Sequence, residues 1–267
     1  MSSPINAPKH LASEAISLSM NSEASRIAAA YDAIASHYDS QLISAQWIRD
    51  RLWERMDALF PIGSRVLDVT AGTGLDALHL VERGVSVVAC DVSSAMLFQL
   101  HDKNPNIETH VVDFNELDLN EEFDGVISTF AGVNTSPDLR PFAKSAAQLL
   151  RPGGILLIHV LNRWSLLDFA RQFVRLRWSA NWQTMVSSQR DVKLGSILVP
   201  HYLYSPLSLY RRVFKPYFRM CSINGQGIIR PLEVGWGKRL EDVERRLAPT
   251  FPFHSLGIFF SIEMSRA

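Results

Sequence analysis

The chain has 267 residues, 47% of them hydrophobic, and a formal net charge of zero. This length allows one large domain with an insertion. Two cysteines are too few for a disulfide framework or a cysteine-rich metal centre, so we expect no metal site. The sequence shows no secretory leader and no apolar run of about 18 residues, so we expect a cytoplasmic protein without a transmembrane segment.

The zero net charge hides an asymmetry. Acidic residues predominate in 1–150 and basic residues in 151–267, with the basic excess concentrated between Arg163 and Arg219. One interpretation is a solvated surface whose halves attract each other. The other is that the later half meets an anionic group on a diphosphate, a carboxylate, a carrier protein or a membrane surface.

The N-terminal part reads as an arm followed by helices. Residues 1–22 are rich in Ser, Ala and Asn, and we expect a flexible arm. Apolar residues at helical spacing predict helices over 25–40 and 47–60, and Pro61 stops the second one. We therefore expect an N-terminal helical cap over residues 23–60.

The next part alternates between short apolar runs and helical patterns. We expect strands at 65–69, 85–91, 107–113, 123–130 and 155–161, and helices at 75–83, 93–103 and 138–150. Alternation of this length predicts a doubly wound, mostly parallel α/β sheet, with residues 61–162 as its core.

After Asn162 the alternation stops. We expect a helix at 164–178, a hairpin within 185–204 and a short helix at 207–214, which together form an inserted α+β lid over 163–215. Residues 216–267 then supply strands at 218–229 and 256–264, with a helix near 241–247 between them. These strands would complete a seven-stranded sheet.

Acidic residues stand at the ends of three successive predicted strands, namely Asp68, Asp91 and Asp113. Ligands of parallel α/β sheets bind at these strand ends, and Gly72 and Gly74 let the backbone approach a ligand closely. The loop also matches the dinucleotide pattern G-x-G-x-x-G/A. However, Asp68 would repel a pyrophosphate and attract an ammonium group. The three acids therefore suit a ligand with an amino group, a ribose and an adenine.

Residues from about 30 to 162 resemble the class I S-adenosylmethionine-dependent methyltransferases, in particular the ubiquinone- and menaquinone-type and natural-product small-molecule enzymes. Tyr31–Asp39 is similar to the cap helix of that family, and Val66–Gly74 to its first motif. Ala89–Leu97 and Leu150–Gly154 resemble its ribose-binding strand end and the turn before its fifth strand. The resemblance implies a Rossmann-like fold and S-adenosylmethionine as the cofactor, with S-adenosylhomocysteine as its product.

The resemblance and the strand-end positions together predict two groups of site residues. The predicted cofactor-binding residues are Tyr38, Asp68, Thr70, Gly72, Gly74, Asp91, Val92, Met96, Asp113, Phe114 and Thr129. The predicted substrate-binding residues are Tyr31, Phe130, Asn134, Arg163 and Tyr202.

Several of these residues have a structural alternative. Asp68 and Asp91 would otherwise cap helices, Asp113 would be a turn acid, and Asn134 would cap a turn. Tyr31 and Tyr38 would only pack the cap helix. Thr70 is a departure, because the family usually has Gly or Ala there. A β-branched Thr resists positive φ, so we expect the loop to differ locally and place cofactor affinity in doubt.

The expected reaction is in-line methyl transfer to a small, largely apolar acceptor at O, N or C, with an anionic group on the acceptor as one option. Lipid-like, isoprenoid, polyketide and carrier-bound acceptors fit the aromatic and basic lid. A hydroxyl or carbon nucleophile needs a general base, and His159 and His201 are the candidates. A satisfied core histidine is the alternative for His159.

Two other functions remain open, a non-methylating reaction such as cyclisation and a catalytically silent binding protein. We expect no nucleic-acid partner, because the basic residues form no recognisable binding module. Either a monomer or a homodimer fits the sequence.

Overall fold

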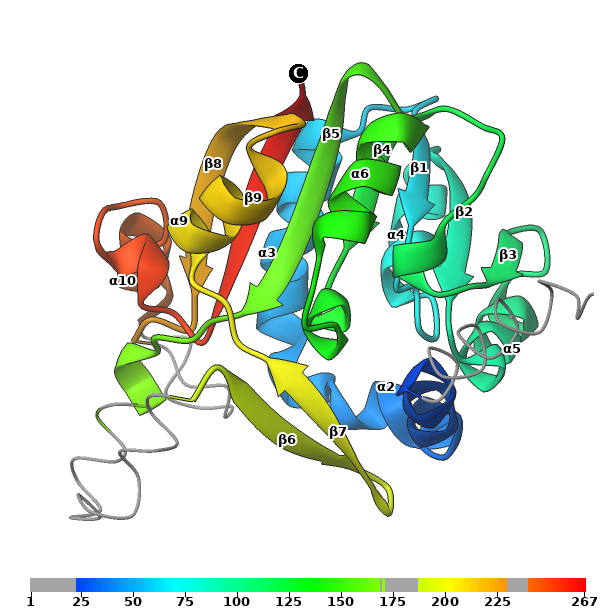
Figure 1. Ribbon diagram of the computed structural model, residues 1–267, viewed down its shortest axis with the longest axis horizontal. Coiled ribbons are helices and arrows are strands. Elements are labelled where there is room, and N and C mark those ends of the chain that lie inside the picture. Colours follow the sequence, from blue (N-terminus) through cyan, green and yellow to red (C-terminus); the bar gives the residue numbers. More distant parts are fainter. Residues whose placement is uncertain (1–22, 169, 171–186, 230–239) are drawn as a thin grey trace, which may run out of the picture.

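The computed structural model describes residues 23–168, 170, 187–229 and 240–267. Seven strands form one sheet in the order β3-β2-β1-β4-β5-β9-β8 (Figure 1). Its strands are β1 Arg65–Asp68, β2 Ser86–Asp91, β3 Glu108–Val111, β4 Phe123–Ser128, β5 Leu150–Leu161, β8 Phe218–Gln226 and β9 Phe259–Arg266. The first five are parallel, and β9 is antiparallel to both β5 and β8. The predicted mostly parallel, seven-stranded α/β fold is therefore confirmed.

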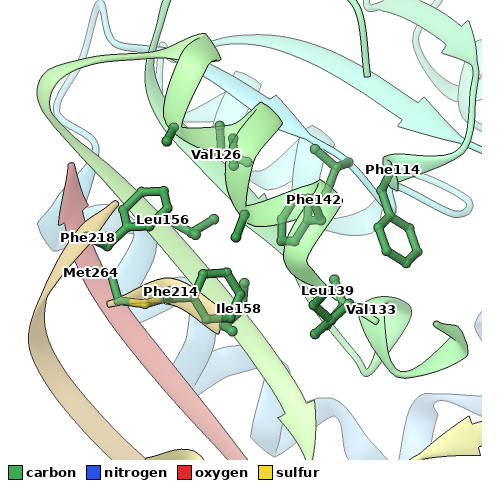
Figure 2. Close-up of a cluster of buried hydrophobic side chains, with 14 of the residues drawn as sticks. Phe114, Val126, Val133, Leu139, Phe142, Leu156, Ile158, Phe214, Phe218 and Met264 are labelled. Atoms are coloured by element: carbon green, nitrogen blue, oxygen red, sulfur yellow. The ribbon is translucent and has the colours of Figure 1, made fainter. Parts of the chain in front are cut away.

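Helices cover both faces of this sheet. The helices α3 Gln46–Leu59, α4 Leu75–Glu82 and α5 Ser94–Lys103 pack on one face through the apolar cluster that contains Leu52, Leu80 and Leu100. On the other face lie α6 Arg140–Leu149, α9 Pro206–Leu209 and the π-helical turn η5 Tyr210–Phe214. Figure 2 shows the core there, where Phe142 from α6 and Phe214 from η5 meet Leu156 and Ile158 of β5.

The N-terminal cap is more broken than predicted. Residues 23–32 are helical, but the expected helix over 25–40 is interrupted and continues as η1 Ala35–His37 and α2 Tyr38–Gln41. A further turn, η2 Ile43–Ala45, leads into α3. Two bidentate ion pairs fix α3, from its Arg55 to Glu263 of β9 and from its Glu54 to Arg245 of α10 Glu241–Leu247.

The predicted hairpin is present as β6 Gln189–Leu194 and β7 Ile197–Tyr202, a separate two-stranded antiparallel sheet. Its Val199 packs against Ile27 and Ala30 of the helix over residues 23–32. In Figure 1 the hairpin lies beyond the end of the main sheet where the β5 arrow points. The predicted helix over 164–178 falls mostly outside the described residues, of which 166–168 and 170 are helical.

Several strand boundaries differ from the sequence prediction. β3 ends at Val111, because Asp113 instead accepts a hydrogen bond from the Asn115 amide and caps the turn η3 Phe114–Glu116. β4 ends at Ser128, because Phe130 and Ala131 have positive φ angles of 46° and 66°. β5 already begins at Leu150. Within the described part of the chain, we find no helix both long and apolar enough to cross a membrane.

Candidate functional site

The loop between β1 and α4 turns sharply at two glycines. Gly72 and Gly74 have φ angles of 54° and 82°, in the left-handed region that favours glycine. Gly74 is also the N-cap of α4, and a Cβ there would lie 2.1 Å from a methyl group of Leu100. The two glycines therefore let the loop turn tightly and let α5 pack directly on it.

Thr70 fits this loop without the strain that the sequence suggested. Its φ is not positive, since the described non-glycine residues with positive φ are Phe130 and Ala131. The Thr70 hydroxyl lies 2.8 Å from that of Ser128, and its side chain faces Gly132. A Cβ on Gly132 would lie only 2.4 Å from Thr70 Cβ. The bulk of Thr70 is thus accommodated by the missing side chain of Gly132.

Asp91, at the end of β2, ties the loop to the next strand. One carboxylate oxygen accepts a hydrogen bond of 2.8 Å from the Gly72 amide, and the other accepts one of 2.9 Å from the Ser93 amide. Burial raises the pKa of Asp91 to about 6, although these amides and that of Val92 favour its charged form. Two of the predicted cofactor residues are therefore joined directly.

Two further buried acids lie close to the loop. Asp68 is 1% exposed, and one of its oxygens accepts from the Thr70 amide at 3.3 Å. Its other oxygen, Oδ2, is buried without a hydrogen-bond partner among the described residues. Burial, and then the neighbouring charge of Asp76, raise the pKa of Asp68 well above its usual range.

Asp76, in the first turn of α4, has a very different environment. Burial opposes its ionisation, but three donors outweigh that effect and lower the pKa of Asp76. Arg49 from α3 forms an ion pair of 2.7 Å with it, Trp53 Nε1 donates at 2.7 Å, and the Thr129 hydroxyl also donates. Arg49 lies 4.0 Å over the ring centroid of Phe130 as well.

These groups surround a pocket of about 650 Å³, including its opening to solvent. The residues that line it are Ile27, Tyr31, Tyr38, Arg49, Val69, Thr70, Ala71, Gly72, Thr73, Leu75, Asp76, Asp91, Val92, Met96, Phe114, Thr129, Phe130, Gly132 and Thr135. Of these, Arg49 is the one basic residue, and Asp76 already neutralises it.

The N-terminal cap is held over this pocket by two carboxylates that the sequence analysis missed. Asp32 accepts hydrogen bonds from the Ser93 hydroxyl and, at 3.1 Å, from the Ala95 amide at the start of α5. Asp39 accepts from the Thr73 hydroxyl in the glycine loop and from Lys103 Nζ at 2.7 Å. Burial raises the pKa of Tyr38 to about 12 and raises that of Tyr31 as well, so both are neutral phenols.

Ten of the predicted cofactor and substrate residues line the pocket, namely Tyr31, Tyr38, Thr70, Gly72, Asp91, Val92, Met96, Phe114, Thr129 and Phe130. Asp68 and Gly74 lie in the same loop segment but do not line it. Arg49, Asp76 and Ile27 line it although the sequence analysis did not select them. Arg49 carried one signal, because it shares a face of α3 with the buried Leu52 and Met56.

The structure places other predicted residues outside the lining. Asp113 caps η3 as described above. Asn134 is fully buried, accepts from the Leu161 amide at 2.9 Å and donates to the Tyr202 carbonyl at 2.6 Å, so it links β5 to β7. Arg163 stacks on Trp164, with 5.3 Å between its guanidinium and the ring. The substrate-binding roles of Asn134, Arg163 and Tyr202 stay predictions.

The two histidines predicted as general bases do not line the pocket either. His201 is 5% exposed in β7, its Nδ1 lies 3.2 Å from the Val199 carbonyl, and burial lowers its pKa. His159 is fully buried in β5, and burial lowers its pKa to about 3. A catalytic base at either position stays a prediction.

Comparison with known proteins agrees with this geometry. Residues 66–154 match the family model of a methyltransferase domain. A demethylmenaquinone methyltransferase from Beutenbergia cavernae is 34% identical over 136 residues, which are 49% of this chain and 56% of that protein. The chain thus spans little more than half the length of the curated relatives it matches.

Solved structures share the fold at low identity. A putative S-adenosylmethionine-dependent methyltransferase from Listeria monocytogenes has a TM-score of 0.59 and 17% identity, covering 80% of this chain and 96% of that one. The DhpI–SAM–HEP complex has a TM-score of 0.62 and 17% identity, covering 91% and 97%. The chain thus has the fold of these solved structures, and its residues 66–154 match a methyltransferase domain.

Proposed function

We propose that this chain transfers a methyl group from S-adenosylmethionine to a small, largely apolar acceptor. The observation that carries the proposal is a single pocket that joins the glycine loop, Asp91 and the Thr129–Phe130 turn under a helical cap. Among the described lining residues, Asp91 is the acid that no ion pair balances, because the charge of Asp76 is balanced by Arg49. An acidic site favours a sulfonium cation that also carries an ammonium group.

The residues present fit this cofactor better than a dinucleotide. Asp68 Oδ2, which is buried without a partner among the described residues, is an acceptor that an ammonium group would satisfy directly or through the loop. Asp91 keeps lone pairs for ribose hydroxyls, since one oxygen accepts from the Gly72 amide and the other from the Ser93 amide. A pyrophosphate would instead meet acids and the already neutralised Arg49.

When bound, the cofactor supplies an electrophilic methyl group, and the protein has to align the acceptor with it. Holding the reacting groups in line accounts for up to roughly 7–11 kcal/mol of a barrier. Tyr38 of the cap and Phe130 of the turn after β4 both line the pocket and would help to exclude water from it. The apolar side chains of Ile27, Phe114 and Phe130 favour an acceptor with a hydrophobic body.

We further propose a lipid-like or isoprenoid acceptor, with a quinol of the demethylmenaquinone type as the first to test. The similar demethylmenaquinone methyltransferases support the choice. A carrier-bound acceptor and an anionic group on the acceptor remain outcomes of the same assay. The described residues that line the pocket include no histidine, so an acceptor that ionises readily fits better than one that needs a strong base.

Calorimetry with S-adenosylhomocysteine tests the cofactor. We expect binding by the wild type and at least a roughly tenfold loss in Asp91→Asn, because two charge-assisted hydrogen bonds to the ribose are weakened. Asp102→Asn is the matched control, since Asp102 is exposed on α5 and does not line the pocket. Absence of heat with the wild type, together with tight binding of a nicotinamide dinucleotide, would refute the proposal.

Mass spectrometry of the product tests the reaction. The wild type is incubated with S-adenosylmethionine and reduced short-chain demethylmenaquinone, alongside phenolic, amine and fatty-acyl acceptors. A gain of one methyl group supports transfer. An unchanged product mass with altered retention indicates isomerisation, and cofactor binding without turnover of any acceptor indicates a silent binding protein.

A further inference from the structure

The chain makes an unusual turn at the end of β4. Phe130 and Ala131 are consecutive non-glycine residues with positive φ, and they are followed by the turn η4 Gly132–Thr135. Side chains with a Cβ adopt this conformation at a free-energy cost, and such residues cluster at functional sites. Thr129, Phe130 and Gly132 all line the pocket. The shape of the pocket wall therefore depends on whatever holds this turn.

Both amides of the turn bond to His159. The Ala131 N–H donates to the His159 carbonyl at 3.0 Å, which is a backbone contact that any residue would make. The Phe130 N–H donates to His159 Nδ1 at 3.2 Å, which only a side chain with an acceptor at this position provides. Without that acceptor, a half-buried Phe130 amide would lose its partner.

The His159 ring also supports the Phe130 ring. The two ring centroids are 5.5 Å apart in an edge-on arrangement, and Phe259 of β9 stacks on His159 at 4.7 Å and lies 6.4 Å from Phe130. The Arg49 guanidinium lies over the ring of Phe130. Phe130 thus contacts Arg49, His159 and Phe259.

One tautomer of His159 is required. Because Nδ1 accepts the Phe130 amide, the ring proton has to reside on Nε2. His159 Nε2 and Gln226 Oε1 are both buried, and neither atom has a hydrogen-bond partner among the described residues. Gln226 interacts with the ring and favours its protonation, but burial dominates and keeps His159 neutral. A small rotation of the Gln226 amide would let its oxygen accept the Nε2 proton.

The geometry points to His159 as a positioning residue, which fixes the left-handed Phe130–Ala131 turn through its neutral Nε2–H tautomer and so shapes the wall of the cofactor and acceptor pocket. The inference rests on the proposed function, because it assigns the turn to that pocket. It differs from a general-base role, since His159 never exchanges a proton with the acceptor.

The tautomer is testable in the wild-type protein. Nitrogen-15 NMR of the histidine side chains, with the His159 signals assigned by comparison with His159→Asn, should show the neutral Nε2–H form from about pH 5.5 to 8. A proton on Nδ1, or titration near the ordinary value of about 6.5, would overturn the inference. This result does not depend on any ligand, so it is separable from a failure of the proposed function.

Three variants test the effect on the pocket. His159→Phe keeps an aromatic ring but removes the acceptor, and we expect S-adenosylhomocysteine to bind about tenfold more weakly by calorimetry. His159→Asn keeps an oxygen near the Nδ1 position and should bind within about threefold of the wild type. Ser261→Ala is the control, because buried Ser261 pairs with His159 across β5 and β9 and its hydroxyl makes no hydrogen bond to the described residues.

The outcomes separate positioning from packing. Wild-type affinity in folded His159→Phe would overturn the inference, as would equal losses in His159→Phe and His159→Asn. A wild type that does not bind S-adenosylhomocysteine at all would instead refute the proposed function, while the tautomer measurement would still decide whether His159 holds the turn.

Discussion

The contact between Thr70 and Gly132 predicts that substitutions at these two positions have strongly non-additive effects on stability. In Gly132→Ala the new Cβ would lie 2.4 Å from Thr70 Cβ and Oγ1 and 2.7 Å from Cγ2. Carbon atoms pack at about 3.5 Å or more, so the two segments have to separate by about 1 Å. Overpacking of this kind costs about 1–3 kcal/mol, and breaking the Thr70–Ser128 hydrogen bond adds about 1 kcal/mol.

We therefore expect Gly132→Ala to lower the free energy of unfolding by about 2–4 kcal/mol, measured by urea denaturation. A second substitution, at Thr70, should restore the lost stability only if it removes the Thr70 Cβ. Thr70→Gly removes Cβ and should recover about 2 kcal/mol in the double variant, whereas Thr70→Ala keeps Cβ at 2.4 Å and should not. Calorimetry with S-adenosylhomocysteine should show the same pattern. Simple additivity of Gly132→Ala and Thr70→Gly would refute the reasoning.

Three other predictions concern charge. Cofactor affinity should rise as the pH increases above the ordinary range of an aspartate, because burial raises the pKa of Asp68 well above that range and the protonated carboxyl cannot attract an ammonium group. Calorimetry in buffers of different ionisation enthalpy should show proton release on binding, and Asp68→Asn should abolish it. Burial lowers the pKa of His159 to about 3 in the folded state, so below about pH 6.5 the unfolded chain binds a proton that the folded chain does not. Between pH 7 and pH 5 the free energy of unfolding of the wild type should therefore fall by about 2 kcal/mol more than that of His159→Asn. Equal losses in the two proteins would contradict this. Lys103→Met should lower the free energy of unfolding by less than about 1 kcal/mol, since the ion pair with Asp39 is partly exposed. The same substitution should speed amide hydrogen exchange in residues 35–41. Unchanged exchange would show that the ion pair does not hold the cap.

The sequence predicted the architecture because strand burial leaves a strong pattern. Runs such as Val87–Cys90 of β2 are apolar throughout, as expected for strands covered on both faces, and the helices between the strands carry clear stops. Boundaries were less accurate where a side chain competes with the hydrogen bonds of the sheet. Asp113 caps a turn with its carboxylate, so β3 ends before the acid that the apolar pattern placed at the strand end.

The sequence predicted the site residues that lie at strand ends. It did not predict those that the N-terminal segment brings to the site. Asp91 and the glycine loop follow from local patterns, and the structure joins them by a hydrogen bond. Arg49 and Asp32 reach the site only through the packing of the N-terminal segment, which short-range spacing does not encode. The pKa of buried Asp68 is raised and that of buried Asp76 is lowered, because Arg49 forms its ion pair with Asp76. Local sequence patterns do not encode this choice either. His159 is a residue type suited to acid–base chemistry, but its ring packs against that of Phe130 and does not line the pocket.

The hairpin and the first described helix depend on each other, because Val199 of β7 and Ile27 and Ala30 of that helix bury one another. Replacing the hairpin by a foreign segment would expose Ile27 and Ala30 and weaken the helix from which Ile27 and Tyr31 reach the pocket. Any redesign of the hairpin therefore has to include matching changes in this helix.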